Sequence, residues 1–188
     1  MKIGILGSGS GSNMQAILDA IAAGTLDASI ALVLSDVPDA FILKRAERHG
    51  IPHGVIDCHG FRTKFPLESQ LETAARLKSA GCDLVCLAGF MRLVKQPLLE
   101  AFAGRILNIH PSLLPAFPGI AAWQQALDAG VAETGCTVHH VDAGMDTGSV
   151  ILQAKVPVLP DDTAETLHAR IQIEEHRLYP EAIRMIAL

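Results

Sequence analysis

The sequence has few cysteines and no apolar run long enough to span a membrane. Its four cysteines form neither a CxxC pair nor a dense disulfide framework, which indicates reduced, buried thiols. These are Cys58, Cys82, Cys86 and Cys136. The opening "MKIGILGSG" is interrupted by glycine too early for the apolar core of a signal peptide. We therefore expect a cytoplasmic protein with no membrane partner.

Basic clusters and metal-binding motifs are also missing. The 15 Lys and Arg residues are outnumbered by 20 Asp and Glu residues, and no basic run could neutralise the phosphates of a nucleic acid. There is no HExxH motif, and the adjacent His139 and His140 would point to opposite faces of a strand, so we expect no metal. Without repeats or linkers, 188 residues predict a single domain spanning residues 1–188.

Short apolar runs alternate with amphipathic stretches through the first two thirds of the chain. The apolar runs are "KIGIL", "SIALVLS", "HGVI", "DLVCLAG" and "GRILNIH". Between them, helical patterns stop at Gly24, Gly50 and Gly81, which suit left-handed C-caps, and a longer helix is expected over Leu67 to Ala80. This alternation predicts an α/β fold, a doubly wound, mostly parallel sheet of the Rossmann-like kind.

The last third of the chain has a different pattern. "TGCTVHHVDAG" and "SVILQAKVPV" resemble strands, and the "DAGMDTG" connection between them suits an antiparallel hairpin. A final helix is expected from about Ala164 to Leu188, with a kink or break at Pro180.

Glycine and serine residues fill the connection between the first strand and a helix expected to begin near Met14. Backbone N–H groups at such a turn, together with the helix dipole, would hold a phosphate. The third glycine of a GxGxxG motif is missing, and no Gly-Lys-Ser/Thr follows, which favours a monophosphate. Asp36, at the end of the second strand, keeps a dinucleotide site open, and a plain turn with Ser12 or Asn13 as N-cap is the alternative.

The segment "LNIHPSLLP" carries an amide and an imidazole two residues apart. Asn108 and His110 therefore share one face at the end of an apolar strand, although such a histidine is often only structural. If the hairpin packs beside this strand, Asp146 of the loop 142–148 can approach His110 and stabilise its imidazolium.

No nucleophilic side chain belongs to this group, because Ser112 lies outside any GxSxG elbow. A site without a nucleophile suggests transfer between two bound substrates, in which an amine attacks a carbonyl. Asn108 and His110 would donate to the developing oxyanion, and His110 with Asp146, directly or through a water, would take the proton that the amine loses.

These motifs resemble the phosphoribosylglycinamide formyltransferases of the folate-dependent formyltransferase family over nearly the whole chain. The matching segments are "GSGSGSNMQAI", "SDVPDAFILKRAERHGI", "LVCLAGFMRLV", "GRILNIHPSLLPAFPG", "AETGCTVHHVDAGMDTGSVILQAKVPV" and "EEHRLYP". The resemblance implies formyl transfer from 10-formyltetrahydrofolate, as co-substrate, to the amine of 5-phosphoribosylglycinamide in de novo purine biosynthesis. Both substrates would be small molecules, and the protein a monomer or a homodimer.

The resemblance also implies roles for individual residues. Asn108, His110 and Asp146 match the family's catalytic trio, with His110 as the proton donor supported by Asp146. Four positions match the residues that bind the ribonucleotide phosphate and ribose: Gly11, Ser12, Asn13 and Glu175. The formyl-folate pocket is expected at Lys64, Met91, Arg92, Leu93, Val94, Asn108, Val141, Asp142, Ala143, Gly144 and Asp146.

Two departures and two alternatives accompany this interpretation. After "FPG" the family commonly carries histidines, whereas Ile120-Ala121-Ala122-Trp123 follow here, and Lys64 stands where relatives have an arginine. A formyltetrahydrofolate hydrolase would use water as the acceptor; such enzymes usually have an N-terminal regulatory domain, which we do not expect ahead of this first strand. A dinucleotide-binding oxidoreductase-type module is the second alternative.

Overall fold

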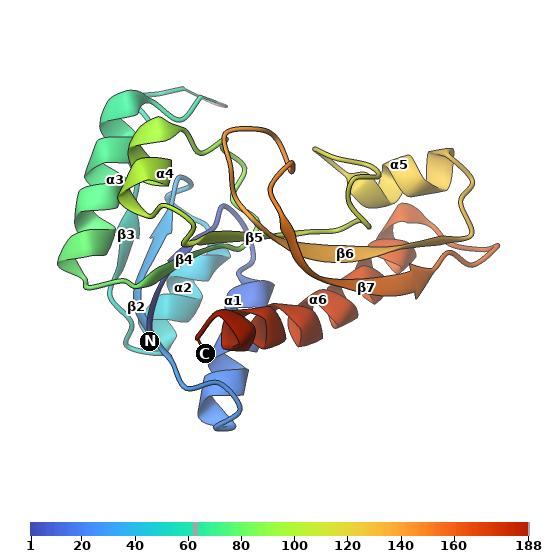
Figure 1. Ribbon diagram of the computed structural model, residues 1–188, viewed down its shortest axis with the longest axis horizontal. Coiled ribbons are helices and arrows are strands. Elements are labelled where there is room, and N and C mark those ends of the chain that lie inside the picture. Colours follow the sequence, from blue (N-terminus) through green and yellow to red (C-terminus); the bar gives the residue numbers. More distant parts are fainter. Residues whose placement is uncertain (62–63, 188) are drawn as a thin grey trace.

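The computed structural model describes residues 1–61 and 64–187, and in this part of the chain seven strands form one sheet (Figure 1). The strands are β1 (Lys2–Leu6), β2 (Ser29–Ser35), β3 (His53–Val55), β4 (Leu84–Leu87), β5 (Ile106–His110), β6 (Glu133–His140) and β7 (Val150–Pro157). Their order in the sheet is β3-β2-β1-β4-β5-β6-β7. Pairing is parallel from β3 to β5, and β6 and β7 join antiparallel. The predicted doubly wound sheet with a C-terminal antiparallel hairpin is confirmed.

Helices cover both faces of the sheet. They are α1 (Ser12–Ala22), α2 (Phe41–Arg48), α3 (Leu67–Ser79), α4 (Gln96–Ala101), α5 (Ala122–Asp128) and α6 (Ala164–Ala187). One apolar core lies between the sheet and α1, α2 and α6, and a second lies between the sheet and α3 and α4. In Figure 1, α3 and α4 lie at the left, while α6 runs beneath β6 and β7. We had predicted neither α4 nor α5, because both are too short to show a clear period.

Alternation along β5 determines which of its residues can form a site. Leu107 and Ile109 enter the core under α1, α2 and α6, whereas Ile106 enters the core under α3 and α4. Asn108 and His110 therefore share the face of Ile106 but lie beyond the cover of α4, at the carboxyl end of the strand. Here the connection between β6 and β7 takes the place of a helix.

Two expectations about helix ends need correction. The first helix begins at Ser12 rather than near Met14, and its N-cap is Gly11 in the left-handed region at φ +73°, with no capping side chain from Ser12 or Asn13. The last helix passes Pro180 without a break, because Tyr179, Ala182 and Ile183 are buried on the sheet side. Leu188, the last residue of that prediction, lies outside the described residues.

Other local predictions agree with the structure. Gly24, Gly50 and Gly81 all have positive φ, as expected of left-handed C-caps. Three of the four free cysteines are buried, and Cys82 is half-buried. None of the helices in the described part of the chain is both long and apolar enough to cross a bilayer.

Candidate active site

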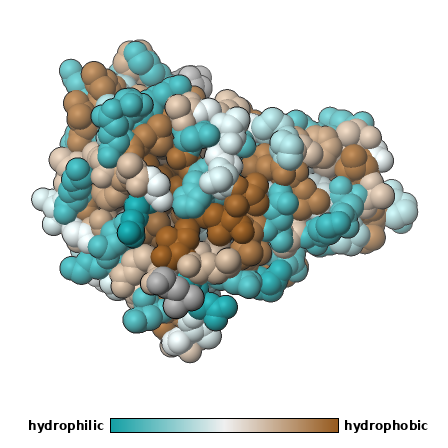
Figure 2. Space-filling view, in the orientation of Figure 1, coloured by the Kyte–Doolittle hydropathy of each residue, from teal (hydrophilic) through white to brown (hydrophobic). Residues whose placement is uncertain are grey.

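A cavity of about 450 Å³ opens at the carboxyl ends of β1, β4 and β5. Between β1 and β4 the chain order of the sheet reverses, which is where ligands of doubly wound sheets bind. The wall consists of the β1–α1 loop, residues 87–94, the end of β5, residues 119–123, the β6–β7 connection and one side of α6. In Figure 2, hydrophobic residues gather at the centre of this face, between the broad part that carries α3 and the narrower part that carries β6.

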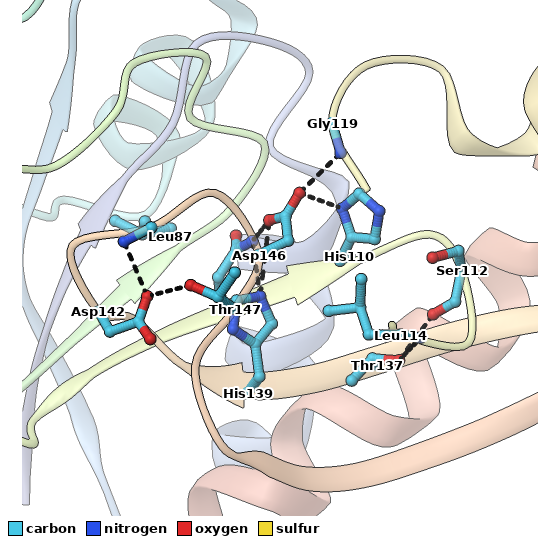
Figure 3. A network of polar contacts seen from close by, with 12 residues as sticks. Leu87, His110, Ser112, Leu114, Gly119, Thr137, His139, Asp142, Asp146 and Thr147 are labelled. Atoms are coloured by element: carbon cyan, nitrogen blue, oxygen red, sulfur yellow. Dashed lines mark hydrogen bonds and ion pairs between the residues drawn. The ribbon is translucent and has the colours of Figure 1, made fainter. Parts of the chain in front are cut away.

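Asp146 lies at the centre of the polar contacts in this cavity. Its Oδ2 accepts a hydrogen bond from the Gly119 N–H at 2.8 Å and lies 3.4 Å from His110 Nδ1 (Figure 3). The other ring nitrogen of His110, Nε2, donates to the carbonyl of Phe117 at 2.8 Å. Both nitrogens of His110 thus face oxygen acceptors, so an imidazolium could donate to both. The prediction that Asp146 lies close to His110 is confirmed by this distance.

His139 determines how the Asn108 amide is oriented. Its Nδ1 lies 2.8 Å from the carbonyl of His140, so Nδ1 carries the proton and Nε2 is left as an acceptor. The Asn108 amide donates to this Nε2 at 3.2 Å and approaches Asp146 Oδ1 at 3.5 Å. Burial lowers the pKa of His139, although the His140 carbonyl and Asp146 oppose the shift, and a neutral ring is the form that can accept this bond.

A short segment, residues 116–121, connects these side chains to α5, and we call it the strap. It supplies the Phe117 carbonyl to His110 and the Gly119 N–H to Asp146. Phe117 and Ala121 have φ of 55° and 52°, and Asp146 has φ of 56°, although none is glycine. Left-handed backbone at non-glycine residues is strained and is concentrated at functional sites.

The β1–α1 loop forms another part of the wall. A Cβ on Gly11 would lie 2.9 Å from Cα of Ile42, and its φ is positive, so glycine is needed where the loop crosses α2. Because no side chain caps α1, the N–H groups of its first turn can bind an anion in the cavity.

Glu175 reaches this loop from α6, where Asn13 Nδ2 donates to its Oε2 at 3.1 Å. The side chain is buried, and burial raises the pKa of Glu175 to about 7, against the smaller effect of the Asn13 hydrogen bond. Asn13 Oδ1 is also buried and has no partner among the described residues. A ligand hydroxyl could satisfy both side chains.

Arg92 and Asp36 form an ion pair beneath the cavity wall. Arg92 Nε lies 2.5 Å from Asp36 Oδ2, and its Nη1 donates to the carbonyls of Phe61 and Lys64. The Ser8 hydroxyl donates to the other oxygen of Asp36 at 2.5 Å. Both oxygens of Asp36 therefore already have partners and the side chain is buried, which weakens the feature on which the dinucleotide alternative rested.

Most of the residues predicted for the site line this one cavity. They are Gly11, Ser12, Asn13, Met91, Arg92, Leu93, Val94, Asn108, His110, Val141, Asp142, Gly144, Asp146 and Glu175. Lys64 and Ala143 do not line it: the Lys64 ammonium lies 5.1 Å from the centre of the Phe61 ring. No group of three or more His, Cys, Asp or Glu side chains in residues 1–61 and 64–187 is arranged to hold a metal ion.

The lining residues that the sequence analysis did not assign to the site include His139, Trp123, His168 and Gln172. His139 could have been found from strand pairing, since it lies directly opposite Asn108 in the β5–β6 register. His168, Gln172 and Glu175 are spaced by four and three residues, which places them on one side of a helix. Trp123 gave no such signal.

Comparison with known proteins agrees with this geometry. A family model described as formyl transferase matches residues 1–183. The chain belongs to the formyl transferase family. The crystal structure of glycinamide ribonucleotide transformylase 1 from Symbiobacterium toebii is 54% identical and superposes with a TM-score of 0.95, over 100% of this chain and 87% of that one.

Relatives of this formyl transferase family differ greatly in length. Phosphoribosylglycinamide formyltransferase of Bacillus subtilis is 43% identical over 98% of this chain and 94% of its own length. The trifunctional purine biosynthetic protein adenosine-3 of Drosophila melanogaster is 46% identical over 98% of this chain. The chain spans only 14% of that relative and 18% of its human counterpart.

Proposed function

We propose that this formyl transferase moves a formyl group from 10-formyltetrahydrofolate to the amine of 5-phosphoribosylglycinamide in de novo purine biosynthesis, in the cytoplasm. The observation that carries the proposal is that Asn108, His110 and Asp146, without a nucleophile of their own, share one cavity with an anion-binding loop. A ribose-phosphate amine and a carbonyl donor are the two substrates that such a cavity suits. The Bacillus subtilis relative, which carries the name of this activity, matches over nearly its whole length and supports the assignment.

The acceptor would lie along the β1–α1 loop. Gly11, Ser12 and Asn13 would offer backbone N–H groups to the phosphate, strengthened by the dipole of α1. Glu175 would accept hydrogen bonds from the ribose hydroxyls, beside the unpartnered Asn13 Oδ1. The amine would then extend toward His110.

The folate would occupy the wall formed by residues 91–94 and 141–146. Leu93, Val94 and Val141 offer apolar surface and backbone polar groups, which suit a flat pterin. The Arg92 guanidinium faces Asp36, so Arg92 would contribute through its backbone. Lys64 and Ala143 do not line the cavity. The contact of Lys64 with the folate tail and that of Ala143 with the folate from the β6–β7 connection stay predictions.

The transfer needs one bond to form and one to break. The acceptor nitrogen attacks the formyl carbon, and the oxyanion that develops would accept a hydrogen bond from the Asn108 amide and be stabilised by the positive charge of the His110 imidazolium. The bond from the formyl carbon to N10 of the folate then breaks as the His110 imidazolium gives its proton to N10, and the neutral His110 ring, supported by Asp146, takes up the proton that the acceptor nitrogen loses. The 3.4 Å between His110 and Asp146 exceeds the length of about 2.8 Å typical of charge-assisted bonds, so we expect it to shorten once substrates bind.

Purified protein with both substrates tests the proposal. His110→Ala and Asp146→Asn should each remove measurable turnover while isothermal titration still detects the ribonucleotide, because the phosphate loop is untouched. Exposed residues of the same types provide matched controls, His49→Ala and Asp161→Asn, and these should keep wild-type rates. Undiminished transfer by both site variants would contradict the proposal.

The hydrolase alternative predicts a different product. Formate release from 10-formyltetrahydrofolate, measured without any amine acceptor, should be negligible beside the rate of transfer. A formate release rate equal to or above the transfer rate would favour the hydrolase.

A further inference from the structure

The one tryptophan of the chain is stacked on a histidine in the wall of the cavity. The rings of Trp123 and His168 are 3.7 Å apart between centroids and inclined by only 9°. Both side chains are half-buried, and both line the cavity. Burial lowers the pKa of His168, so at neutral pH the ring is uncharged and can lie flat on the indole.

Trp123 belongs to the helix that holds the strap. Within α5, the Gln125 side-chain amide donates to the carbonyls of Pro118 and Ile120, at 3.0 Å each. The strap in turn supplies the Phe117 carbonyl to His110 and the Gly119 N–H to Asp146. A shift of α5 would therefore move the backbone groups that orient two residues of the catalytic trio.

His168 belongs to the helix that carries the acceptor-binding carboxylate. His168, Gln172 and Glu175 face the cavity from successive turns of α6, and Glu175 contacts Asn13 in the β1–α1 loop. The position of α6 therefore determines where the ribose of an acceptor would lie.

The ring stack and apolar packing join α5 to α6. The two helices pack against each other, but in the described part of the chain no hydrogen bond or ion pair joins a residue of α5 to a residue of α6. Aromatic pairs have a preferred geometry and stabilise it beyond the effect of area burial, so the stack favours one placement of α5 against α6.

We propose that Trp123 and His168 are positioning residues for formyl transfer. Their stack fixes the position of the strap relative to α6, and so the position of His110 and Asp146 relative to the acceptor-binding side of α6. The inference rests on the proposed function. Neither ring has to touch the reacting atoms, since a misplacement of about 1 Å is enough to slow a positioned reaction as much as a hundredfold.

Steady-state kinetics of ring variants test this role. Trp123→Ala and His168→Ala should each lower kcat about tenfold with the KM for the folate unchanged, because neither ring belongs to the wall proposed for the folate, residues 91–94 and 141–146. Trp123→Phe, which keeps an aromatic ring, should retain most of kcat. The double alanine variant should be no slower than either single variant, since both remove the same contact. Ile173→Ala, at an exposed position on α6, is the control and should match the wild type.

Fluorescence tests the stack independently of activity. Trp123 is the sole tryptophan, so loss of the His168 ring should change its emission intensity in the folded protein, and Ile173→Ala should not. Unchanged emission in His168→Ala would overturn the inference, as would unchanged kcat in both alanine variants of an active enzyme. If Trp123→Ala does not fold, His168→Ala decides alone. Absence of transfer by the wild type would overturn the proposed function instead.

Discussion

Among the individual residues of the site, His139 has the clearest supporting role. Its Nδ1 is fixed by the His140 carbonyl, and its Nε2 accepts from Asn108, so the ring keeps the amide nitrogen of Asn108, rather than the amide oxygen, on the side of His139 and Asp146. An Asn108 amide that can rotate would present its oxygen to the oxyanion for part of the time.

His139→Ala should therefore lower kcat by about tenfold to a hundredfold, the scale of losing an ordered oxyanion donor or its support. The KM for the ribonucleotide should change little, since we propose that its phosphate binds at the β1–α1 loop. Steady-state kinetics against both substrates would measure this. The neighbouring His140→Ala is the control, because the His140 side chain does not line the cavity.

Glu175 predicts a pH dependence of stability. Its pKa is raised from 4.5 to about 7 in the folded protein, so between these values the folded state binds more protons than the unfolded state. Stability from this group is present below pH 4.5 and is lost as the pH rises through 7, and at about 1.4 kcal/mol per pKa unit the loss approaches about 3 kcal/mol.

Urea unfolding at several pH values between 5 and 8 would measure it. Glu175→Gln should become more stable relative to the wild type as the pH rises across this range. Glu174→Gln, next along α6 and paired with Arg177 at 2.8 Å, should follow the wild-type dependence. A constant difference between the wild type and Glu175→Gln would contradict the assignment.

Among the secondary-structure elements, the β6–β7 connection depends on Gly148. A Cβ at this position would collide with the carbonyl of His140, the group that fixes His139 Nδ1. The connection can therefore pass close to β6 only because residue 148 has no side chain.

Gly148→Ala should push the connection away from β6 and displace His139 and Asp146 together. We expect a melting temperature several degrees lower, since a steric clash of this kind costs about 1–3 kcal/mol, and a fall in kcat larger than that of His139→Ala. Ser149→Ala, an exposed neighbour, is the control for both calorimetry and kinetics. Wild-type kcat in Gly148→Ala would show that the connection tolerates the shift.

Strand and helix positions could be predicted where the spacing of apolar residues stayed regular over a long enough stretch of sequence. Parallel strands buried on both faces, such as Leu84–Leu87, appear as continuous apolar runs, and glycine C-caps mark helix ends. The helix does not break at Pro180, because burial of the turns around it outweighs one missing N–H. The strap was missed because left-handed residues such as Phe117 and Ala121 leave no pattern in a sequence, and α5 because it is too short to show a period.

Across the whole molecule, the site depends on contacts between distant parts of the chain. Asn13 and Glu175 are 162 residues apart in sequence, and His168 meets Trp123 across two helices. Periodicity indicates on which face of its helix or strand a residue lies. It does not indicate which distant part of the chain packs against that face. Asn108 and His110 could be paired from their spacing alone, whereas the role of Glu175 came only from the resemblance to formyltransferases.

Because the cavity joins both halves of the sheet, a ligand bound there should stabilise the entire fold. Ribonucleotide at about a hundred times its Kd adds about 2.7 kcal/mol, which for a chain of this size raises the melting temperature by roughly 5–10 °C. NAD and NADP should cause no shift, since Asp36 is buried and already paired with Arg92 and Ser8. Calorimetry with each compound measures the difference, and Asn13→Ala, which leaves the fold's core intact, should reduce only the shift caused by the ribonucleotide. A larger rise in melting temperature with NAD than with the ribonucleotide would favour the dinucleotide-binding alternative.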